Sequence, residues 1–260
     1  TIEGKTALMF AVEVGRVDSI AALVRRGTNV DKELENGATP LIYAGTKSEL
    51  EAMSALVQRG ANVEHENGKG RTALVEMASL GRLAAISTLL EYCQAKPDRE
   101  TASGFTALMA AAANGQVEAC ERLTSLGATV DHENKNGETA LAAAARANQV
   151  AACEALVKAG ADWTYENNYG HTALSMVCKD GNEKMVRELQ RMGAPLDQET
   201  TFGNTALMQA VTSKQMQLLP VLKAAGVSID FENKYAKTAL MLAAEQENAE
   251  AIARLVQIGA

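Results

Sequence analysis

Long apolar runs, aromatic residues and prolines are all scarce in this 260-residue sequence, in which aromatics make up 4% and prolines number four. No apolar run approaches the roughly 18 residues that a membrane-spanning helix needs, and no signal peptide is recognisable. Hydrophobic residues nevertheless make up 47% of the chain. Small aliphatic residues without rings suit thin stacked layers better than one large globular core. Insertion into a membrane is therefore not expected.

A surplus of basic residues is also missing. The sequence has 32 acidic against 25 basic residues, which leaves a formal net charge of −7. Because the phosphate backbone of a nucleic acid is itself negative, it would be repelled by such a chain. Nucleic acid is therefore not an expected partner.

One short phrase, by contrast, occurs eight times. Thr-Ala-Leu or Thr-Pro-Leu recurs every 33 residues, with one interval of 34, and its copies begin at Thr6, Thr39, Thr72, Thr106, Thr139, Thr172, Thr205 and Thr238. A glycine stands two residues before the threonine in seven copies, and another follows 21 residues after it in seven. A fixed period of this length indicates a tandem array of one structural unit. We expect a single domain over residues 1–260, with repeats at about 1–33, 34–66, 67–100, 101–133, 134–166, 167–199, 200–232 and 233–260.

Each repeat predicts a pair of helices. The threonine can cap a short first helix, as before Ala107–Ala112, because its hydroxyl accepts a free N–H of the first turn. An amphipathic second helix follows, for example over 117–126, and Gly127 suits the left-handed residue that ends many helices. The polar remainder predicts a tight turn held by short polar side chains, namely Asn67, Asn134, Asn167, Asn233, Thr101 and Thr200. The expected fold is an all-α solenoid with short hairpin-like fingers.

This unit resembles the ankyrin repeat, whose 33-residue signature is Gly-x-Thr-Pro-Leu-His-x-Ala-Ala, and the resemblance covers the whole chain. The proline of the signature is kept only at Pro40, and its histidine is replaced in every copy, for example by Met109 and Ser175. The resemblance implies two antiparallel helices and a β-hairpin finger in each repeat. It also implies that partners bind to the finger tips and to the first helices.

The four cysteines are interpreted as free thiols. Cys120 and Cys153 occupy the same place in adjacent repeats, and packed helices lie about 8–10 Å apart. A disulfide needs Cα atoms within about 7 Å, so we expect this pair to be unbridged. Free thiols are typical of a reducing compartment, which predicts a cytoplasmic protein, with the nucleus as the alternative.

Motifs of catalysis and metal binding are missing. His65, His132 and His171 fall on polar turns of different repeats, where they cannot share one metal ion, and no Cys-x-x-Cys pair occurs. The sequence therefore predicts no cofactor, no metal site and no enzymatic activity.

Two irregularities interrupt the array. Between the third and fourth repeats, the closing glycine is replaced by Cys93, one residue is added and Pro97 follows, so we expect this finger to differ from its neighbours. In the seventh repeat, Pro220 falls inside the second helix, where it would remove a hydrogen bond and kink that helix.

Six of the ten aromatic residues fall in predicted fingers of the second half of the chain. Three stand three residues before a capping threonine, Tyr169, Phe202 and Tyr235, and Trp163, Tyr165 and Phe231 lie in the same fingers. Aromatic side chains supply much of the energy at protein interfaces. The leading candidate site for a partner therefore consists of Tyr165, Tyr169, Phe202, Phe231 and Tyr235. The alternative is that these rings pack on one another and only stiffen the fingers.

Glutamates recur at one position of the fingers, at Glu33, Glu66, Glu100, Glu133, Glu166, Glu199 and Glu232. A row of like charges attracts cations, so Glu133, Glu166, Glu199 and Glu232 are the candidate contacts for a basic partner. The alternative is that each carboxylate accepts backbone N–H groups of the fingers or pairs with a nearby cation such as Arg71 or Lys234.

These features predict a non-enzymatic scaffold or adaptor that binds another protein or peptide, basic in character, along its fingers and concave face. Two alternatives stay open. The array can be the targeting or regulatory arm of a larger enzyme or channel, or a structural subunit of a large assembly such as a cytoskeletal one. Because neither end resembles a polar capping repeat, we also expect the sequence to be part of a longer chain.

Overall fold

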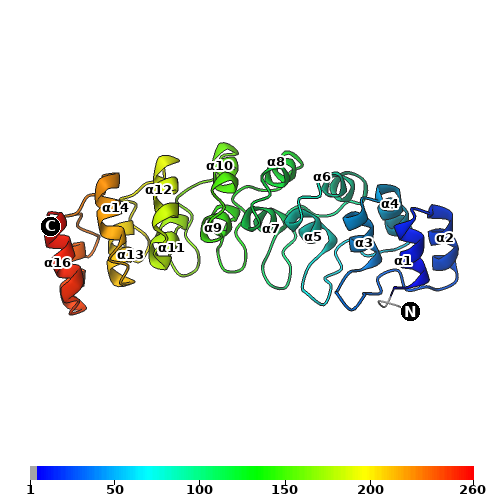
Figure 1. The fold of residues 1–260 in the computed structure, drawn as a ribbon, viewed down its shortest axis with the longest axis horizontal. Coiled ribbons are helices and arrows are strands. Elements are labelled where there is room, and N and C mark those ends of the chain that lie inside the picture. The colour runs from blue at the N-terminus through cyan, green and yellow to red at the C-terminus, as the bar shows by residue number, and fades with distance from the viewer. Residues whose placement is uncertain (1–4) are drawn as a thin grey trace. The chain divides into compact units, whose positions relative to one another are not determined.

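The computed structural model describes residues 5–260, which form helices joined by turns, without a strand (Figure 1). The chain divides into two compact units, residues 1–134 and 135–260. This division comes one residue after the predicted boundary between the fourth and fifth repeats. Gly4, the first glycine of the recurring phrase, lies outside the described residues.

The first unit contains four helix pairs. They are α1 (Ala7–Glu13) with α2 (Val17–Arg25), α3 (Pro40–Lys47) with α4 (Leu50–Gln58), α5 (Ala73–Ser79) with α6 (Leu83–Ser87), and α7 (Ala107–Ala113) with α8 (Val117–Ser125). Helix α6 continues as a wide π-helical turn, η2 (Thr88–Tyr92). Within this unit the pairs lie side by side, and the loops that join one pair to the next project to the same side (Figure 1). These loops are called fingers here.

The second unit repeats the arrangement. Its pairs are α9 (Ala140–Arg146) with α10 (Val150–Lys158), α11 (Ala173–Asp180) with α12 (Glu183–Arg191), α13 (Ala206–Thr212) with α14 (Leu218–Ala225), and α15 (Ala239–Glu245) with α16 (Ala249–Ile258). None of the described helices has the length and apolar composition of a membrane span.

The recurring threonine caps the first helix of every pair. In all eight repeats its Oγ1 accepts a hydrogen bond from the backbone N–H three residues later, at 3.2–3.4 Å. The eight predicted helix starts are therefore confirmed. A cap of this kind is worth about 1 kcal/mol, so the phrase contributes to folding in every repeat.

The core of each unit lies between the first and second helices of its repeats. The leucine two residues after the capping threonine is at most 5% exposed at Leu8, Leu41, Leu74, Leu108, Leu141, Leu174 and Leu207. A second leucine, 17 residues after the threonine, is fully buried at Leu56, Leu89, Leu123, Leu156, Leu189, Leu222 and Leu255. Burying each of these side chains stabilises the fold by about 1.5–3 kcal/mol. Aliphatic layers thus fill the core, as the scarcity of aromatics predicts.

The residue added between Thr72 and Thr106 lies in a helix and not in a finger. It is accommodated by the π-helical turn η2, and Gln94, with a φ of 58°, takes the left-handed conformation that glycine has at this point in other repeats. The finger that follows keeps its usual turn, in which the Gly104 N–H donates to the Thr101 carbonyl at 2.8 Å. The expectation of a deviant finger is therefore wrong, because one wide helical turn takes up a residue without altering the finger.

The kink predicted at Pro220 is also wrong. In seven repeats the second helix begins 11 residues after the capping threonine, whereas α14 begins at Leu218, 13 residues after Thr205. Pro220 is thus the third residue of its helix, where a backbone N–H has no acceptor within the helix. The proline delays the start of the helix and removes no hydrogen bond from it.

The four cysteines are buried free thiols, as predicted. Burial raises the pKa of the Cys120 and Cys178 thiols to about 12. Because the thiolate is the reactive form of cysteine, these side chains act as small packing residues of the core.

Candidate interaction surface

Short polar side chains hold the finger turns, as the sequence predicts. Asn67 Oδ1 accepts the backbone N–H groups of Lys69 and Arg71, both at 3.0 Å, and Asn67 Nδ2 donates to the Gly37 carbonyl of the preceding finger at 2.6 Å. Asn233 makes the equivalent three bonds in the last finger. These asparagines are buried. Each therefore shapes its own finger and ties it to the one before.

Carboxylates connect each finger to the one that follows it. Glu33 Oε2 accepts the backbone N–H of Gly68, in the next finger, at 2.7 Å. The same relationship joins Glu66 to Ala102 at 2.7 Å, Glu166 to Thr201 at 2.8 Å, and Glu199 to Lys234 at 2.8 Å. We call these four glutamates the carboxylate ladder. At these positions the alternative expectation, that the carboxylates accept finger N–H groups, is confirmed.

A second acidic residue stands two positions before Glu33, Glu66 and Glu199, and it makes a similar bond to the next repeat. Asp31 accepts the N–H of Asn62 at 3.1 Å, and Asp197 accepts that of Ser228 at 3.1 Å. Both carboxylates thus point along the unit toward the next repeat. Hydrogen bonds from N–H groups to charged acceptors are among the stronger ones in proteins, so the ladder holds neighbouring repeats in register.

Basic side chains also face the finger glutamates in the first unit, but they are not the ones expected. Arg71, which precedes α5, pairs with Glu76 in that helix at 2.8 Å. The group that Lys234 offers to Glu199 is its backbone N–H. The basic residue is instead the seventh residue before the capping threonine. His65 lies 3.2 Å from Glu33, and Arg99 lies 3.4 Å from Glu66. His132 lies 3.3 Å from Glu100, which occupies the same finger position but is not one of the four ladder residues.

The surroundings of Glu33 lower the pKa of its carboxyl group. The Gly68 N–H and, to a smaller extent, His65 hold the pKa of this carboxyl below its usual value. Both favour the charged form, so Glu33 is an anion that the fold has already compensated. No cluster of metal-ligating side chains occurs among the described residues.

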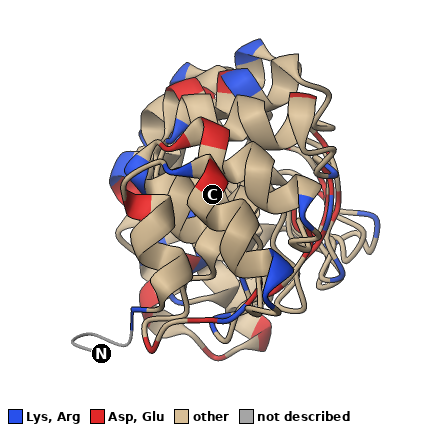
Figure 2. Ribbon diagram, turned by 90° about the vertical axis from the view of Figure 1, so that its right-hand side faces the viewer, with Lys and Arg blue, Asp and Glu red and all other residues tan. Residues whose placement is uncertain are grey.

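The same position is uncharged in the second unit. It is taken by Tyr165, Gln198 and Phe231. Glu166 and Glu199 therefore bind finger N–H groups but form no ion pair among the described residues. Glu232 and Glu133, the remaining candidate glutamates, are exposed. In Figure 2 residues of both charges can be followed along the finger loops.

The candidate aromatic residues lie on the finger surface of this second unit. Tyr169, Phe202 and Tyr235 are 68%, 58% and 58% exposed, and Tyr165 is 37% exposed. Phe231, like Trp163, is half-buried.

Two of these rings rest on a glycine of the preceding finger. The Phe202 ring lies against Gly170, and the Tyr235 ring lies so close to Gly203 that a methyl group there would come within 2.6 Å of Tyr235 Cε2. The two rings are thus supported by the preceding finger and remain 58% exposed, and Lys234 Nζ lies 5.4 Å from the centre of the Tyr235 ring.

A second charged surface, on the first helices, was missed by the sequence analysis. The residue directly before the capping threonine forms an ion pair with the residue seven positions after that threonine. The pairs are Lys5–Glu13 at 3.2 Å, Glu138–Arg146 at 2.8 Å and Lys237–Glu245 at 2.8 Å. Opposite charges eight residues apart were visible in the sequence. Whether the two side chains meet depends on the backbone conformation at the capping threonine, because the first residue of each pair lies before the helix.

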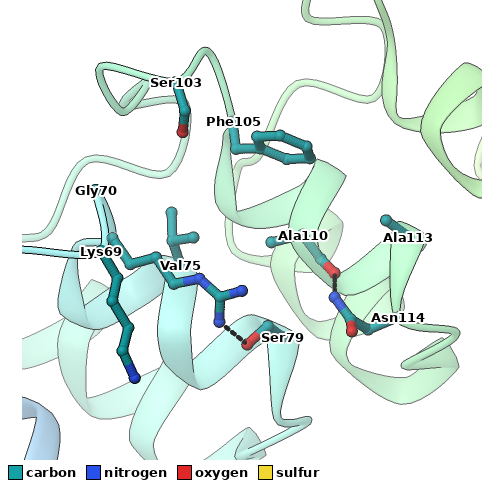
Figure 3. Close-up of a pocket in the computed structure, with 10 residues that line it drawn as sticks. Lys69, Gly70, Val75, Ser79, Ser103, Phe105, Ala110, Ala113 and Asn114 are labelled. Carbon is teal, nitrogen blue, oxygen red and sulfur yellow. Dashed lines mark hydrogen bonds between the residues drawn. The ribbon is translucent and has the colours of Figure 1, made fainter. Parts of the chain in front are cut away.

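Between α5 and α7 this surface is hollow (Figure 3). The cavity has a volume of about 400 Å³. Its lining comprises Lys69, Gly70, Arg71, Val75 and Ser79 on one side, and Ser103, Phe105, Ala110, Ala113 and Asn114 on the other. Ser79 and Ala113 stand where the paired repeats have Glu13 and Arg146, and their short side chains leave the space open.

Helix pairs capped at one recurring threonine and tied through their fingers define an all-α solenoid built from tandem repeats. A sequence model described as ankyrin repeats (three copies) matches residues 1–67, 50–134, 74–167, 126–198, 141–229 and 174–260. These matches cover the chain, which therefore belongs to the ankyrin repeat family. Ankyrin repeats are generally protein-interaction modules.

Comparison of the fold gives a consistent result. The crystal structure of the human ASB11 ankyrin repeat domain is similar to this chain with a TM-score of 0.57 and 21% sequence identity, over 98% of this chain and 99% of that chain. At this identity the likeness concerns the fold alone. A comparison with curated proteins gave no match.

Proposed function

We propose that the chain is a non-enzymatic scaffold or adaptor that binds a polypeptide partner along its fingers and concave face, with the fingers of the second unit as the main contact. The observation that carries the proposal is the combination, in one set of fingers, of exposed aromatic rings with ladder carboxylates that form no ion pair with any described residue. In the first unit, by contrast, Arg99 pairs with Glu66, and the His65 ring lies within hydrogen-bonding distance of Glu33.

The chemistry of this surface suits a basic partner. A lysine or arginine can approach Glu166 or Glu199 while its alkyl stem lies on an aromatic ring, and cations are attracted to ring faces. Phe202 rests against Gly170 and thereby has a supported position before any partner arrives. Less side-chain freedom is then lost on binding, which favours affinity.

The proposed setting is the cytoplasm, with the nucleus as the alternative, and it is supported by the four free cysteines. The proposed lack of enzymatic activity is supported by membership of a family of interaction modules.

The test begins with affinity capture of partners by the wild-type chain and their identification by mass spectrometry. The affinity of the main partner is then measured for the triple variant Tyr169→Ala, Phe202→Ala, Tyr235→Ala. We expect a loss of tenfold or more, because central aromatic residues dominate many interfaces. Tyr92→Ala is the matched control, since Tyr92 is 75% exposed but lies in the first unit. Equal affinity for a triple variant of unchanged helicity would reject the proposed site.

A further inference from the structure

We propose that the hollow between α5 and α7 in the first unit binds an extended segment of a partner that presents an aspartate or glutamate side chain next to a bulky apolar residue. This surface lies in the other unit from the aromatic fingers and has the opposite charge preference. It can therefore be tested separately from the proposed function.

One side of the hollow is apolar and incompletely covered. Phe105 is 41% exposed, although aromatic residues are rare in this chain. Figure 3 shows its ring beside the helix that carries Ala110 and Ala113. Because these alanines are small, a leucine, isoleucine or phenylalanine of a partner can lie against the ring and fill the space above them. Covering this surface would remove apolar area from water.

The other side of the hollow is cationic. Lys69 and Arg71 are the charged residues of the lining, which contains no carboxylate. The Lys69 stem lies over Gly37, where a methyl group would be 3.3 Å from Lys69 Cγ. Its ammonium forms no ion pair among the described residues. A partner carboxylate can thus reach a lysine whose stem is already supported.

The charges around the hollow favour a partner that brings a single carboxylate. Arg71 Nη1 donates to Glu76 Oε2 at 2.8 Å and to Ser79 Oγ at 3.5 Å, so that Glu76 offsets the Arg71 charge. The positive charge of Lys69 then remains. One carboxylate balances it, whereas a phosphate dianion would leave a negative charge over. In the first repeat Glu13, the counterpart of Ser79, pairs with Lys5, the counterpart of Arg71, at 3.2 Å.

The remaining polar groups suit a peptide backbone. Asn114 Nδ2 donates to the Ala110 carbonyl at 2.8 Å, which leaves Asn114 Oδ1 as an acceptor for a peptide N–H. The volume of about 400 Å³ lies within the usual range of about 300–1,000 Å³ for ligand sites. An extended segment can therefore place a carboxylate at Lys69 and an apolar side chain at Phe105 from neighbouring positions.

The experiment uses random dodecapeptides displayed at the N-terminus of a phage coat protein, so that no free C-terminal carboxylate is presented. They are selected in parallel on the wild-type chain, on Lys69→Glu and on Lys158→Glu. Lys158→Glu makes the same charge change on an exposed residue of the second unit. We expect peptides with an acidic residue next to a bulky apolar one to be enriched on the wild-type chain and on Lys158→Glu, and to be lost on Lys69→Glu.

One selected peptide, made with acetylated and amidated ends, is then titrated by fluorescence anisotropy. Lys69→Glu, and replacement of the acidic residue of the peptide by its amide, should each weaken binding at least tenfold. Phe105→Ala should weaken it at least fivefold, with the helicity of both protein variants checked by circular dichroism. The proposal is overturned if acidic peptides are not enriched, if they persist on Lys69→Glu, or if phosphoserine in place of the acidic residue binds more tightly.

Discussion

Glu33 in one finger and Gly68 in the next are joined by a hydrogen bond of 2.7 Å, from the glycine N–H to the carboxylate. The two residues are 35 positions apart, and the bond recurs between equivalent residues along both units. It connects a side chain that faces solvent to the backbone of another repeat. A surface residue can therefore contribute to the coupling between repeats, and this relationship leads to the first two predictions.

Replacement of a ladder glutamate should destabilise the fold. Glu33→Gln keeps the size of the side chain but removes the charge that the Gly68 N–H and His65 bind. Hydrogen bonds to charged groups are worth about 1.5–3 kcal/mol, and the partial exposure of Glu33 reduces this to about 1 kcal/mol. The measurement is urea denaturation followed by circular dichroism. Glu232→Gln is the control, because Glu232 occupies the same place in the last finger, and an equal loss there would contradict the role of the ladder.

The stability contributed by Glu33 should depend on pH. Its folded-state pKa lies below the ordinary value of 4.5, so the unfolded state takes up the proton first as the pH falls. The contribution is complete well above pH 4.5 and is lost as the pH falls through the lowered folded-state pKa. Denaturation at pH 7 and at successive values below 4.5 should show the wild-type chain and Glu33→Gln converging in stability. A gap that stays constant into acid would contradict this linkage.

The contact between Phe202 and Gly170 can be isolated with a double-mutant cycle. Gly170→Ala places a methyl group against the ring and puts a side chain at a φ of 66°, whereas Gly70→Ala has a φ of 68° with no atom closer to the methyl group than Ser103 Oγ at 3.9 Å. The backbone cost of about 1–2 kcal/mol applies to both, so Gly170→Ala should be the more destabilising. In a Phe202→Ala background that excess should disappear. Its persistence would show that the ring does not cause it.

Gln94→Gly should stabilise the protein. Gln94 has a φ of 58°, at the point where a glycine ends the second helix in the other repeats. Removing the side chain relieves the backbone strain of a left-handed residue, which should raise the free energy of unfolding by about 1 kcal/mol. Gln190→Gly, inside α12, should have the opposite sign, because glycine is a poor residue within a helix. Thermal unfolding of both variants is the measurement, and a lower melting temperature for Gln94→Gly would refute the assignment.

Binding of the partner to the second unit should weaken as salt is added. Exposed charges are screened beyond about 8 Å at physiological ionic strength, so affinity measured from 0.05 to 0.5 M NaCl should fall at least fivefold. Glu232→Gln should reduce this dependence more than Glu247→Gln, an exposed glutamate outside the fingers. An affinity indifferent to salt would mean that the carboxylates take no part in binding.

Much of the fold could be predicted because its signals are local. The capping of Ala107 by Thr106 depends on residues close in sequence, and its repetition revealed the period. The predictions for the added residue near Cys93 and for Pro220 were wrong, because each irregularity can be accommodated in two ways of similar free energy. An added residue can widen a finger or a helical turn, and Pro220 can bend a helix or delay its start. Only the packing of neighbouring repeats decides between such alternatives.

The candidate site divides in the same way. Aromatic residues at one position of successive fingers were expected to lie on a surface, and Tyr169 and Tyr235 are exposed there. The hollow at Phe105 gave no such signal, because it results from two short side chains, Ser79 and Ala113, on adjacent helices. An empty space is a property of the surrounding atoms, and no single residue encodes it.

The amino-acid sequence by itself determined the repeat, its two helices, its capped starts and the position of each finger, since these follow from hydrogen bonds and hydrophobic contacts within one period. The tertiary structure decided which partner each charge takes. Glu33 could have met a basic side chain or a backbone N–H, and it meets both, because stacking brings Gly68 and His65 of the next finger within hydrogen-bonding distance. Electrostatic energies depend on separations of a few ångströms, which only the packed repeats define.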